Sequence, residues 1–250
     1  MDLGLSDKVA LVAGGSSGLG FAIAAGLLAE GARVSIAARD PERVDDAVRQ
    51  LSGQGEVHGQ AVDVRDESAV NRWVAAVAER FGGIHVVLAN AGGPPAGMAT
   101  DFDLDDYRQA LELNLLGSIR LVQRALPHLK TAGWGRILFL TSSSVRQPIP
   151  NLALSNTARA GVVGYAKSLV AALGPGDITV NVLAPGLTRT ARLTHLHGSD
   201  VSALGAEIPL GRVAEPEEFA AVAVFLASTR ASYVTGAVVP VDGGATRSLL

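Results

Sequence analysis

The sequence predicts an α/β domain built on a doubly wound parallel sheet of about seven strands, with helices on both faces. Short apolar runs alternate with helical patterns along the whole chain of 250 residues, as repeated β-α-β units do. The runs are continuously apolar rather than alternating, which is typical of strands buried on both faces. No linker, tandem repeat or low-complexity tract divides the chain, so a single domain over 1–250 is expected.

The strands are predicted where runs of Val, Ile, Leu and Ala are too short for a buried helix. The first run leads directly into a glycine-rich turn, as the first strand of a nucleotide-binding sheet does. In chain order the predicted strands are Val9–Ala13, Arg33–Ala37, Val57–Val62, Ile84–Ala89, Arg136–Thr141, Thr179–Leu183 and Ala237–Pro240.

The predicted helices lie between these strands, and two of them carry clear end signals. Leu19–Glu30 ends at Gly31, and Asp66–Phe81 begins with a capping aspartate and ends at a glycine pair. The segment 187–208 is the least periodic, and its position predicts a mobile lid over a binding site. The other predicted helices are Pro41–Leu51, Leu104–Lys130, Ser155–Leu173 and Pro216–Ala227.

Composition narrows the classes of function. The net charge is −3 with no basic stripe, which argues against nucleic acid as a partner. The absence of cysteine excludes disulfides, thiolate catalysis and cysteine-ligated metals. No apolar run approaches the ~20 residues of a membrane span, and the start has no cationic segment followed by an apolar one. We therefore expect no membrane association and a cytoplasmic location.

A phosphate-binding turn is predicted after the first strand. Gly14, Gly18 and Gly20 form a GxxxGxG pattern, and glycine permits a tight turn whose backbone N–H groups approach a diphosphate at a helix N-terminus. Ser16 and Ser17 can add hydroxyl donors to the phosphate oxygens. The alternative is a glycine-rich turn without a ligand, because such a turn alone is a weak signal.

The end of the second strand indicates which nicotinamide cofactor is bound. An acidic residue there would accept a hydrogen bond from the ribose 2′-hydroxyl, but Ala37-Ala38-Arg39 has no acid before Asp40. Arg39 is suited to pair with a 2′-phosphate. The alternative is a solvated arginine at a helix entry. NADP(H) is therefore favoured over NAD(H).

Further motifs occur in the order found in one family. Asn90-Ala91-Gly92 follows the fourth predicted strand, Asn114 lies in the long fourth helix, and Ala184–Thr190 contains a Pro-Gly pair. With these motifs the chain resembles the short-chain dehydrogenase/reductase family over nearly its whole length, most of all its β-ketoacyl-carrier-protein reductase-like members. The resemblance implies a single-domain Rossmann fold, a nicotinamide dinucleotide, hydride transfer to or from a carbonyl or alcohol, and a homotetramer or homodimer.

The resemblance also assigns residues to the cofactor. It implies that Asp63 and Val64 contact the adenine and that the Pro-Gly segment lies beside the nicotinamide. Combined with the glycine turn and Arg39, the predicted cofactor-binding residues are Gly14, Ser16, Ser17, Gly18, Leu19, Gly20, Arg39, Asp63, Val64, Asn90, Ala91, Gly92, Arg159, Pro185, Gly186, Thr188 and Thr190.

The catalytic pattern of the family is altered in this chain. Ser142 matches the serine that binds the substrate carbonyl, but Ser155 and Arg159 stand where the family has Tyr and Lys. Tyr165 does not replace the missing tyrosine, because its spacing of two to Lys167 does not place both groups on one helix face. The predicted catalytic residues are Asn114, Ser142, Ser155 and Arg159; no metal site is predicted.

The substitutions affect the supply of a proton. A serine hydroxyl is a weak acid and arginine does not normally deprotonate, yet Arg159 can hold the nicotinamide ribose and stabilise an oxyanion. Histidine side chains in general can exchange protons near neutral pH, but His195 and His197 are expected to be an exposed pair rather than proton donors or metal ligands.

Three hypotheses about function follow. The first is an NADP(H)-dependent reductase acting on a small or acyl-thioester carbonyl, such as a 3-oxoacyl thioester. The second is a catalytically silent dinucleotide-binding protein with a sensor or structural role. The third is a different reaction on the same fold, such as an elimination with Arg159 as an oxyanion clamp.

Overall fold

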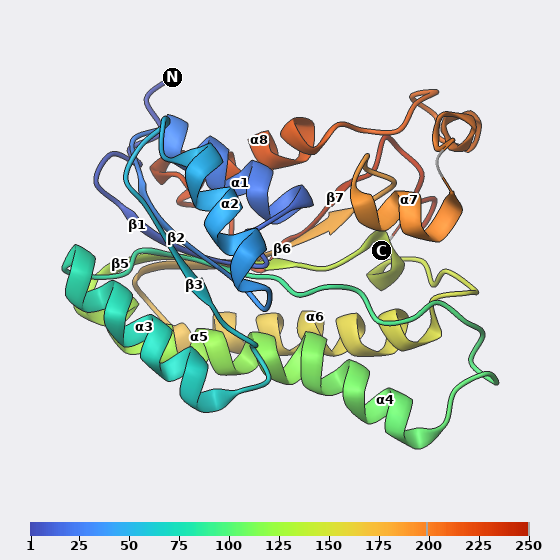
Figure 1. Cartoon of the computed structure of the whole chain (residues 1–250), viewed down its shortest axis with the longest axis horizontal. Coiled ribbons are helices and arrows are strands. Elements are labelled where there is room, and N and C mark those ends of the chain that lie inside the picture. The colour runs from blue at the N-terminus through green and yellow to red at the C-terminus, as the bar shows by residue number, and fades with distance from the viewer. Residues whose placement is uncertain (199, 250) are drawn as a thin grey trace.

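A seven-stranded parallel sheet forms the centre of the computed structural model, which describes residues 1–198 and 200–249 (Figure 1). The strand order is β3-β2-β1-β4-β5-β6-β7, so β1 pairs with β2 on one side and β4 on the other. The predicted fold class is confirmed; Ser199 of the predicted lid and Leu250 of the predicted domain lie outside the described residues. The strands are β1 (Val9–Ala13), β2 (Arg33–Ala38), β3 (Val57–Ala61), β4 (Val86–Ala89), β5 (Trp134–Leu140), β6 (Asp177–Pro185) and β7 (Val238–Val241).

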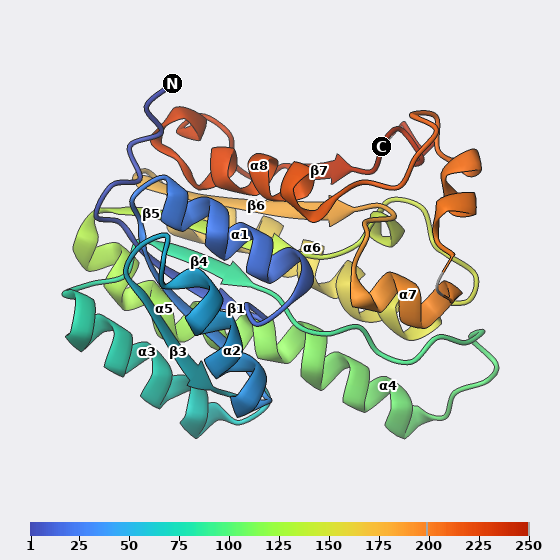
Figure 2. The same cartoon turned by 45° about the horizontal axis from the view of Figure 1, so that its top comes forward.

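Helices cover both faces of the sheet, as Figures 1 and 2 show. Ala10 and Val12 of β1 face a core that includes residues of α1, α2 and α8, while Val9 and Leu11 face a core that includes residues of α3, α5 and α6. This alternation explains why the central strands, such as β1 and β4, are apolar throughout. The helices are α1 (Gly18–Ala29), α2 (Pro41–Leu51), α3 (Glu67–Phe81), α4 (Leu104–Leu111), α5 (Gly117–Ala132), α6 (Ala153–Leu173), α7 (Ala191–His197) and α8 (Pro216–Ala227).

The predicted single helix Leu104–Lys130 is wrong in one respect. A π-helical segment, Glu112–Leu116, separates α4 from α5. Its wider turn contains Asn114, whose Nδ2 donates to the carbonyl oxygen of Gly92 at 2.9 Å. Single π-helical turns within α-helices are frequent at functional sites. The interruption therefore ties the helix to the loop that follows β4.

The predicted lid contains more regular structure than its sequence suggested. Helix α7 begins after Thr190, whose Oγ1 accepts a hydrogen bond from the backbone N–H of Leu193, and a 3₁₀ helix covers Ser202–Glu207. Leu193, Val201 and Ile208 belong to a small apolar cluster of their own. The described residues of this segment thus include a helix, a 3₁₀ helix and a small apolar cluster. Among the described residues, no helix has the length and apolar character needed to cross a membrane.

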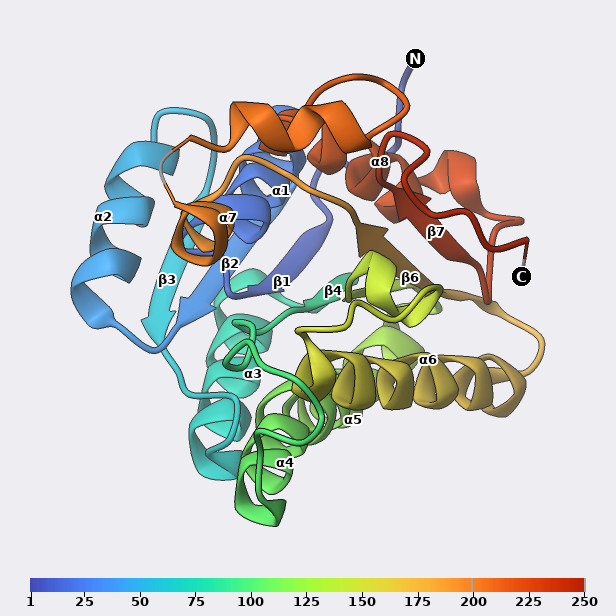
Figure 3. The ribbon, with the colours of Figure 1, turned by 90° about the vertical axis from the view of Figure 1, so that its right-hand side faces the viewer.

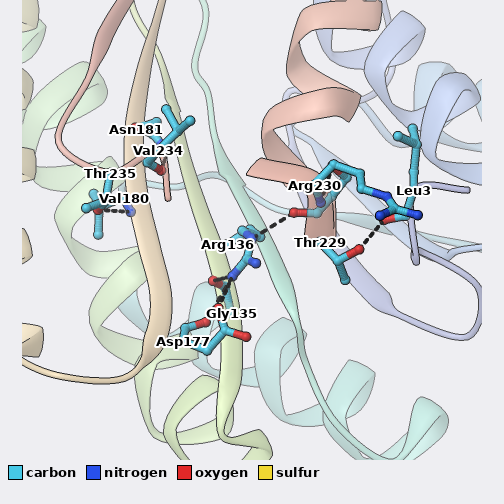
Figure 4. A network of polar contacts seen from close by, with 11 residues as sticks. Leu3, Gly135, Arg136, Asp177, Val180, Asn181, Thr229, Arg230, Val234 and Thr235 are labelled. Atoms are coloured by element: carbon cyan, nitrogen blue, oxygen red, sulfur yellow. Dashed lines mark hydrogen bonds and ion pairs between the residues drawn. The ribbon is translucent and has the colours of Figure 1, made fainter. Parts of the chain in front are cut away.

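Arg136 of β5 is completely buried and links three parts of the fold (Figure 4). Its Nε donates to the carbonyl oxygen of Ser228 at 3.0 Å, and its Nη1 donates to the carbonyl oxygens of Gly135 and Asp177, both at 2.9 Å. The guanidinium also lies 4.2 Å from the centroid of the Trp134 ring. It joins the starts of β5 and β6 to the segment after α8.

Replacing Arg136 by methionine is expected to lower the free energy of unfolding by about 1–3 kcal/mol, because buried carbonyl oxygens lose their donors. Urea unfolding would measure the change. The control is Arg49→Met, since Arg49 forms an exposed ion pair with Asp46 that contributes little. Equal stability of the two variants would show that the Arg136 network does not stabilise the fold.

Candidate active site

A cleft of about 1000 Å³ opens at the carboxyl ends of the strands, where β1 lies between β2 and β4. In doubly wound sheets the strand order reverses at such a point, and ligands bind there. Loops after β1, β4, β5 and β6 line the cleft together with α7. Figure 3 looks toward this side of the molecule, with α7 on the opposite side of the strands from α4 and α6.

The glycine turn after β1 is packed so closely that it leaves no room for a side chain at Gly14 or Gly20. An added Cβ at Gly20 would lie 2.2 Å from the carbonyl oxygen of Gly14, and one at Gly14 would lie 2.4 Å from Nδ2 of Asn90. Gly14 and Gly18 also have positive φ angles, 62° and 56°. These positions therefore require glycine.

The start of α1 offers donors to an anion. Ser17 occupies the N-cap position, but its side chain makes no capping hydrogen bond. The first N–H groups of a helix have no partner within the helix, and they carry the positive end of its dipole. At α1 these groups belong to Gly18, Leu19 and Gly20, which all line the cleft. The turn fits the diphosphate of a dinucleotide.

The end of the cleft beside β2 is positively charged. Arg39 and Arg43 line it. The carboxylate of Asp40 accepts hydrogen bonds from the backbone N–H groups of Glu42 and Arg43, at 3.0 and 3.2 Å, and thereby caps α2. Asp40 is thus already engaged, so this end fits a 2′-phosphate better than a 2′-hydroxyl.

Of the two residues predicted to contact the adenine, only one lines the cleft. Val64 lines the cleft, whereas Asp63 lies outside its lining. The carboxylate of Asp63 accepts a hydrogen bond from Nη2 of Arg65 at 2.6 Å, and this contact holds the pKa of Asp63 below its ordinary value. The side chain of Asp63 is thus directed to Arg65.

All the other predicted cofactor residues line the same cleft. Asn114, predicted as a catalytic residue, does not, and instead supports Gly92 through the hydrogen bond described above. Gly186 packs so closely on Asp242 that an added Cβ would lie 2.6 Å from the aspartate Cβ. The lining residues predicted from the sequence are Gly14, Ser16, Ser17, Gly18, Leu19, Gly20, Arg39, Val64, Asn90, Ala91, Gly92, Arg159, Pro185, Gly186, Thr188 and Thr190.

Ser142, Ser155 and Arg159 also line the cleft. Helix α6 begins at Ala153, so Ser155 lies in its first turn and Arg159 one turn later. Nε of Arg159 donates to Oγ of Ser155 at 3.1 Å. Oγ of Ser142 accepts from the backbone N–H of Ser144 at 3.1 Å. The spacing of four thus places Ser155 and Arg159 in direct contact.

Arg159 is a buried cation. Its side chain is 8 % exposed, and its Nη1 donates to the carbonyl oxygens at the end of β5, those of Leu140 and Thr141, both at 2.9 Å. Burial and the charge of Arg192 lower the pKa of Arg159 to about 10. The expectation that this arginine does not deprotonate therefore holds at neutral pH but not in strongly alkaline solution.

Arg192 is the main cleft residue that the sequence did not reveal. It lies on α7, lines the cleft, and donates from Nη2 to the carbonyl oxygen of Pro94 at 2.6 Å. Its guanidinium packs on Gly93, where an added Cβ would lie 3.0 Å from the arginine Nε. The available signal was its place two residues beyond Thr190, in a segment already expected beside the nicotinamide.

The other residues considered as proton donors or metal ligands are less well placed for a role in the cleft. His197 lines the cleft and His195 does not, although both lie exposed on α7. Tyr165 lies outside the cleft lining and packs edge-on against Phe139, with 5.9 Å between ring centroids. Within the described part of the chain, no group of three or more His, Cys, Asp or Glu residues is placed to hold a metal ion.

Comparison with known proteins agrees with this site. Residues 13–246 match the family model described as enoyl-(acyl carrier protein) reductase. A 3alpha-hydroxysteroid dehydrogenase of Mediterraneibacter gnavus is 35% identical over 244 residues, covering 96% of this chain and 98% of the relative.

Two solved structures are also similar. One is L-sorbose reductase from Gluconobacter frateurii complexed with NADPH and L-sorbose, with a TM-score of 0.93, 33% identity and 100% of both chains covered. Another is an NADPH-bound short chain oxidoreductase from Pseudomonas aeruginosa PAO1 containing an atypical catalytic center, with a TM-score of 0.91, 30% identity and 98% of both chains covered. Together with the cleft and its glycine turn, these matches show that the chain belongs to the short-chain dehydrogenase/reductase family of NAD(P)-dependent oxidoreductases.

Proposed function

We propose that the protein transfers hydride between NADP(H) and a carbonyl or alcohol substrate, with small carbonyls and 3-oxoacyl thioesters as candidates. The observation that carries this proposal is the contact of Ser155 with Arg159 inside the cleft that the glycine turn also lines. It puts hydroxyl donors and a buried positive charge together, which is what a developing oxyanion requires. The NADPH bound in the similar structures supports the choice of cofactor.

A reduced nicotinamide held by the cleft would supply a hydride to the carbonyl carbon, and the carbonyl oxygen would then carry negative charge until it is protonated from solvent. Ser142 and Ser155 each accept one hydrogen bond from the protein, so their O–H groups are free to donate to the substrate oxygen. Arg159 holds Ser155 and places its charge beside the oxygen as negative charge develops.

Titration of the purified protein with NADPH and then NADH, followed by intrinsic and cofactor fluorescence, tests the first half of the proposal. Tight NADPH binding with weaker NADH binding would support the assigned cofactor and justify a screen of carbonyl substrates. Failure to bind either dinucleotide would reject the proposed function.

Arg39→Ala is expected to weaken NADPH binding about tenfold and leave NADH binding unchanged, because only NADPH carries the 2′-phosphate. The dissociation constants of both cofactors would be compared by the same titration. Arg49→Ala is the matched control, since Arg49 lies on the nearby helix α2 and pairs with Asp46. An equal loss for both cofactors would contradict a role in selecting the phosphate.

A catalytically silent dinucleotide-binding protein is the second candidate, and the replacement of the family's tyrosine by Ser155 favours it. This candidate predicts cofactor binding without turnover of any carbonyl in the screen. A homotetramer or homodimer is also proposed, supported by two exposed large apolar side chains, Leu116 at the end of the π-helical segment and Phe225 on α8. Light scattering would measure the assembly, and cell fractionation would test the expected cytoplasmic location.

A further inference from the structure

Arg159 and Arg192 line the cleft, and neither forms an ion pair with an acidic residue in the described part of the chain. Arg159 comes from α6 and Arg192 from α7. Their hydrogen-bond acceptors are all neutral: the hydroxyl of Ser155 and backbone carbonyl oxygens. Their two charges are thus uncompensated within the described part of the chain.

The acidic residues of the cleft do not neutralise this pair. Asp40 caps α2, and Glu207 is an exposed residue of the 3₁₀ helix Ser202–Glu207. Burial lowers the pKa of Arg192, and burial together with the charge of Arg192 lowers that of Arg159. Like charges that are partly removed from water are unfavourable, so an anion between them would be strongly attracted.

The position of Arg192 indicates which kind of anion the two arginines would bind. Its guanidinium packs on Gly93 and donates to Pro94, on the loop that follows β4. The backbone donors for a cofactor diphosphate lie at the start of α1, where Gly18 adjoins Thr190 at the N-cap of α7, whereas the guanidinium of Arg192 reaches the loop after β4. Arg192 therefore retains donors for a group on the substrate, and a guanidinium suits a carboxylate because it presents parallel N–H groups.

We propose that the substrate is a short oxo acid, or the matching hydroxy acid, whose carboxylate is bound by Arg192 while its carbonyl oxygen faces Ser142 and Ser155. This inference rests on the proposed function and narrows it. Arg159 and Arg192 both line this cleft, and the charge of Arg192 lowers the pKa of Arg159, so the two cations act on one another there. A thioester lacks this carboxylate, which makes 3-oxoacyl thioesters the poorer candidates.

Oxalate and its neutral analogue oxamide would test the proposal on the protein saturated with NADPH, by isothermal titration calorimetry. Oxalate is expected to bind at least about tenfold more tightly than oxamide, and Arg192→Gln to lose about tenfold of the oxalate affinity. Arg189→Gln is the matched control, because Arg189 pairs with Glu215 outside the cleft lining and its removal takes away the same charge. It is expected to bind oxalate like the wild type.

Other outcomes overturn the proposal. Equal binding of oxalate and oxamide by the wild type would show that no carboxylate site exists, whatever the fate of the variant. A parallel loss of NADPH affinity in Arg192→Gln would assign Arg192 to the cofactor phosphates instead. If the wild type fails to bind NADPH, the proposed function is rejected, while oxalate titration of the cofactor-free protein still tests the arginine pair separately.

Discussion

Replacing Gly20 by alanine is expected to raise the dissociation constant for NADPH by more than about 100-fold. The reason is that moving the groups of a binding site by about 1 Å can weaken their action by about 100-fold. The new Cβ would lie 2.2 Å from the carbonyl oxygen of Gly14 and 2.8 Å from its carbonyl carbon. Both are backbone atoms, so no side-chain rotation relieves the overlap. The turn has to open, which moves the N–H groups of α1 away from the phosphates.

Fluorescence titration with NADPH measures this effect, and circular dichroism shows whether the variant is folded. Gly164→Ala is the control, because Gly164 lies in α6 with no atom within 4 Å of an added Cβ. It is expected to bind NADPH like the wild type. A folded Gly20→Ala protein with unchanged affinity would mean that the dinucleotide does not occupy the glycine turn. If that variant does not fold, Ser17→Ala tests the same turn without a steric conflict.

The sequence predicted the sheet well because the central strands β1, β4 and β5 are buried on both faces and leave continuous apolar runs. The glycine turn was equally clear, since its spacing reflects backbone contacts within a few residues. Gly14 and Gly20 are six positions apart and meet in one turn. Such local constraints are visible in a single sequence.

Features that depend on distant packing were not predictable in the same way. The π-helical segment Glu112–Leu116 spans too few residues to change the periodicity of Leu104–Lys130 visibly. The place of Arg192 depends on Pro94, which is 98 positions away in the sequence. Helix α7 is short, and its buried Leu193 belongs to a small apolar cluster with Val201, Ile208 and Val213 rather than to the main core. The engagement of Asp63 by Arg65 likewise shows only in three dimensions.

Removing the guanidinium of Arg159 is expected to lower kcat/KM for carbonyl reduction by about 100- to 1000-fold, the usual effect of losing one donor to an oxyanion. Arg159→Met would leave Ser155 without its hydrogen bond and the substrate oxygen without the nearby charge. Steady-state kinetics on a substrate found in the screen would measure the loss. Arg146→Met is a control, because Arg146 donates to the carbonyl oxygen of Val238 and lies outside the cleft lining. Equal rates for the two variants would contradict the assigned role.

The pH dependence of kcat/KM distinguishes an effect of the positive charge of Arg159 from an effect of Arg159 on folding. Its pKa of about 10 means that the charge, and with it kcat/KM, is lost as the pH rises through about 10. The folded state has the lower pKa, so the unfolded chain binds more protons above pH 10, and this titration raises stability there rather than reducing it. A fall in activity with unchanged circular dichroism therefore reports the charge itself. Ser142→Ala should have a lower kcat/KM but should show the same fall of kcat/KM at alkaline pH. Arg159→Met should not show this fall. If the fall persists in Arg159→Met, it belongs to another group.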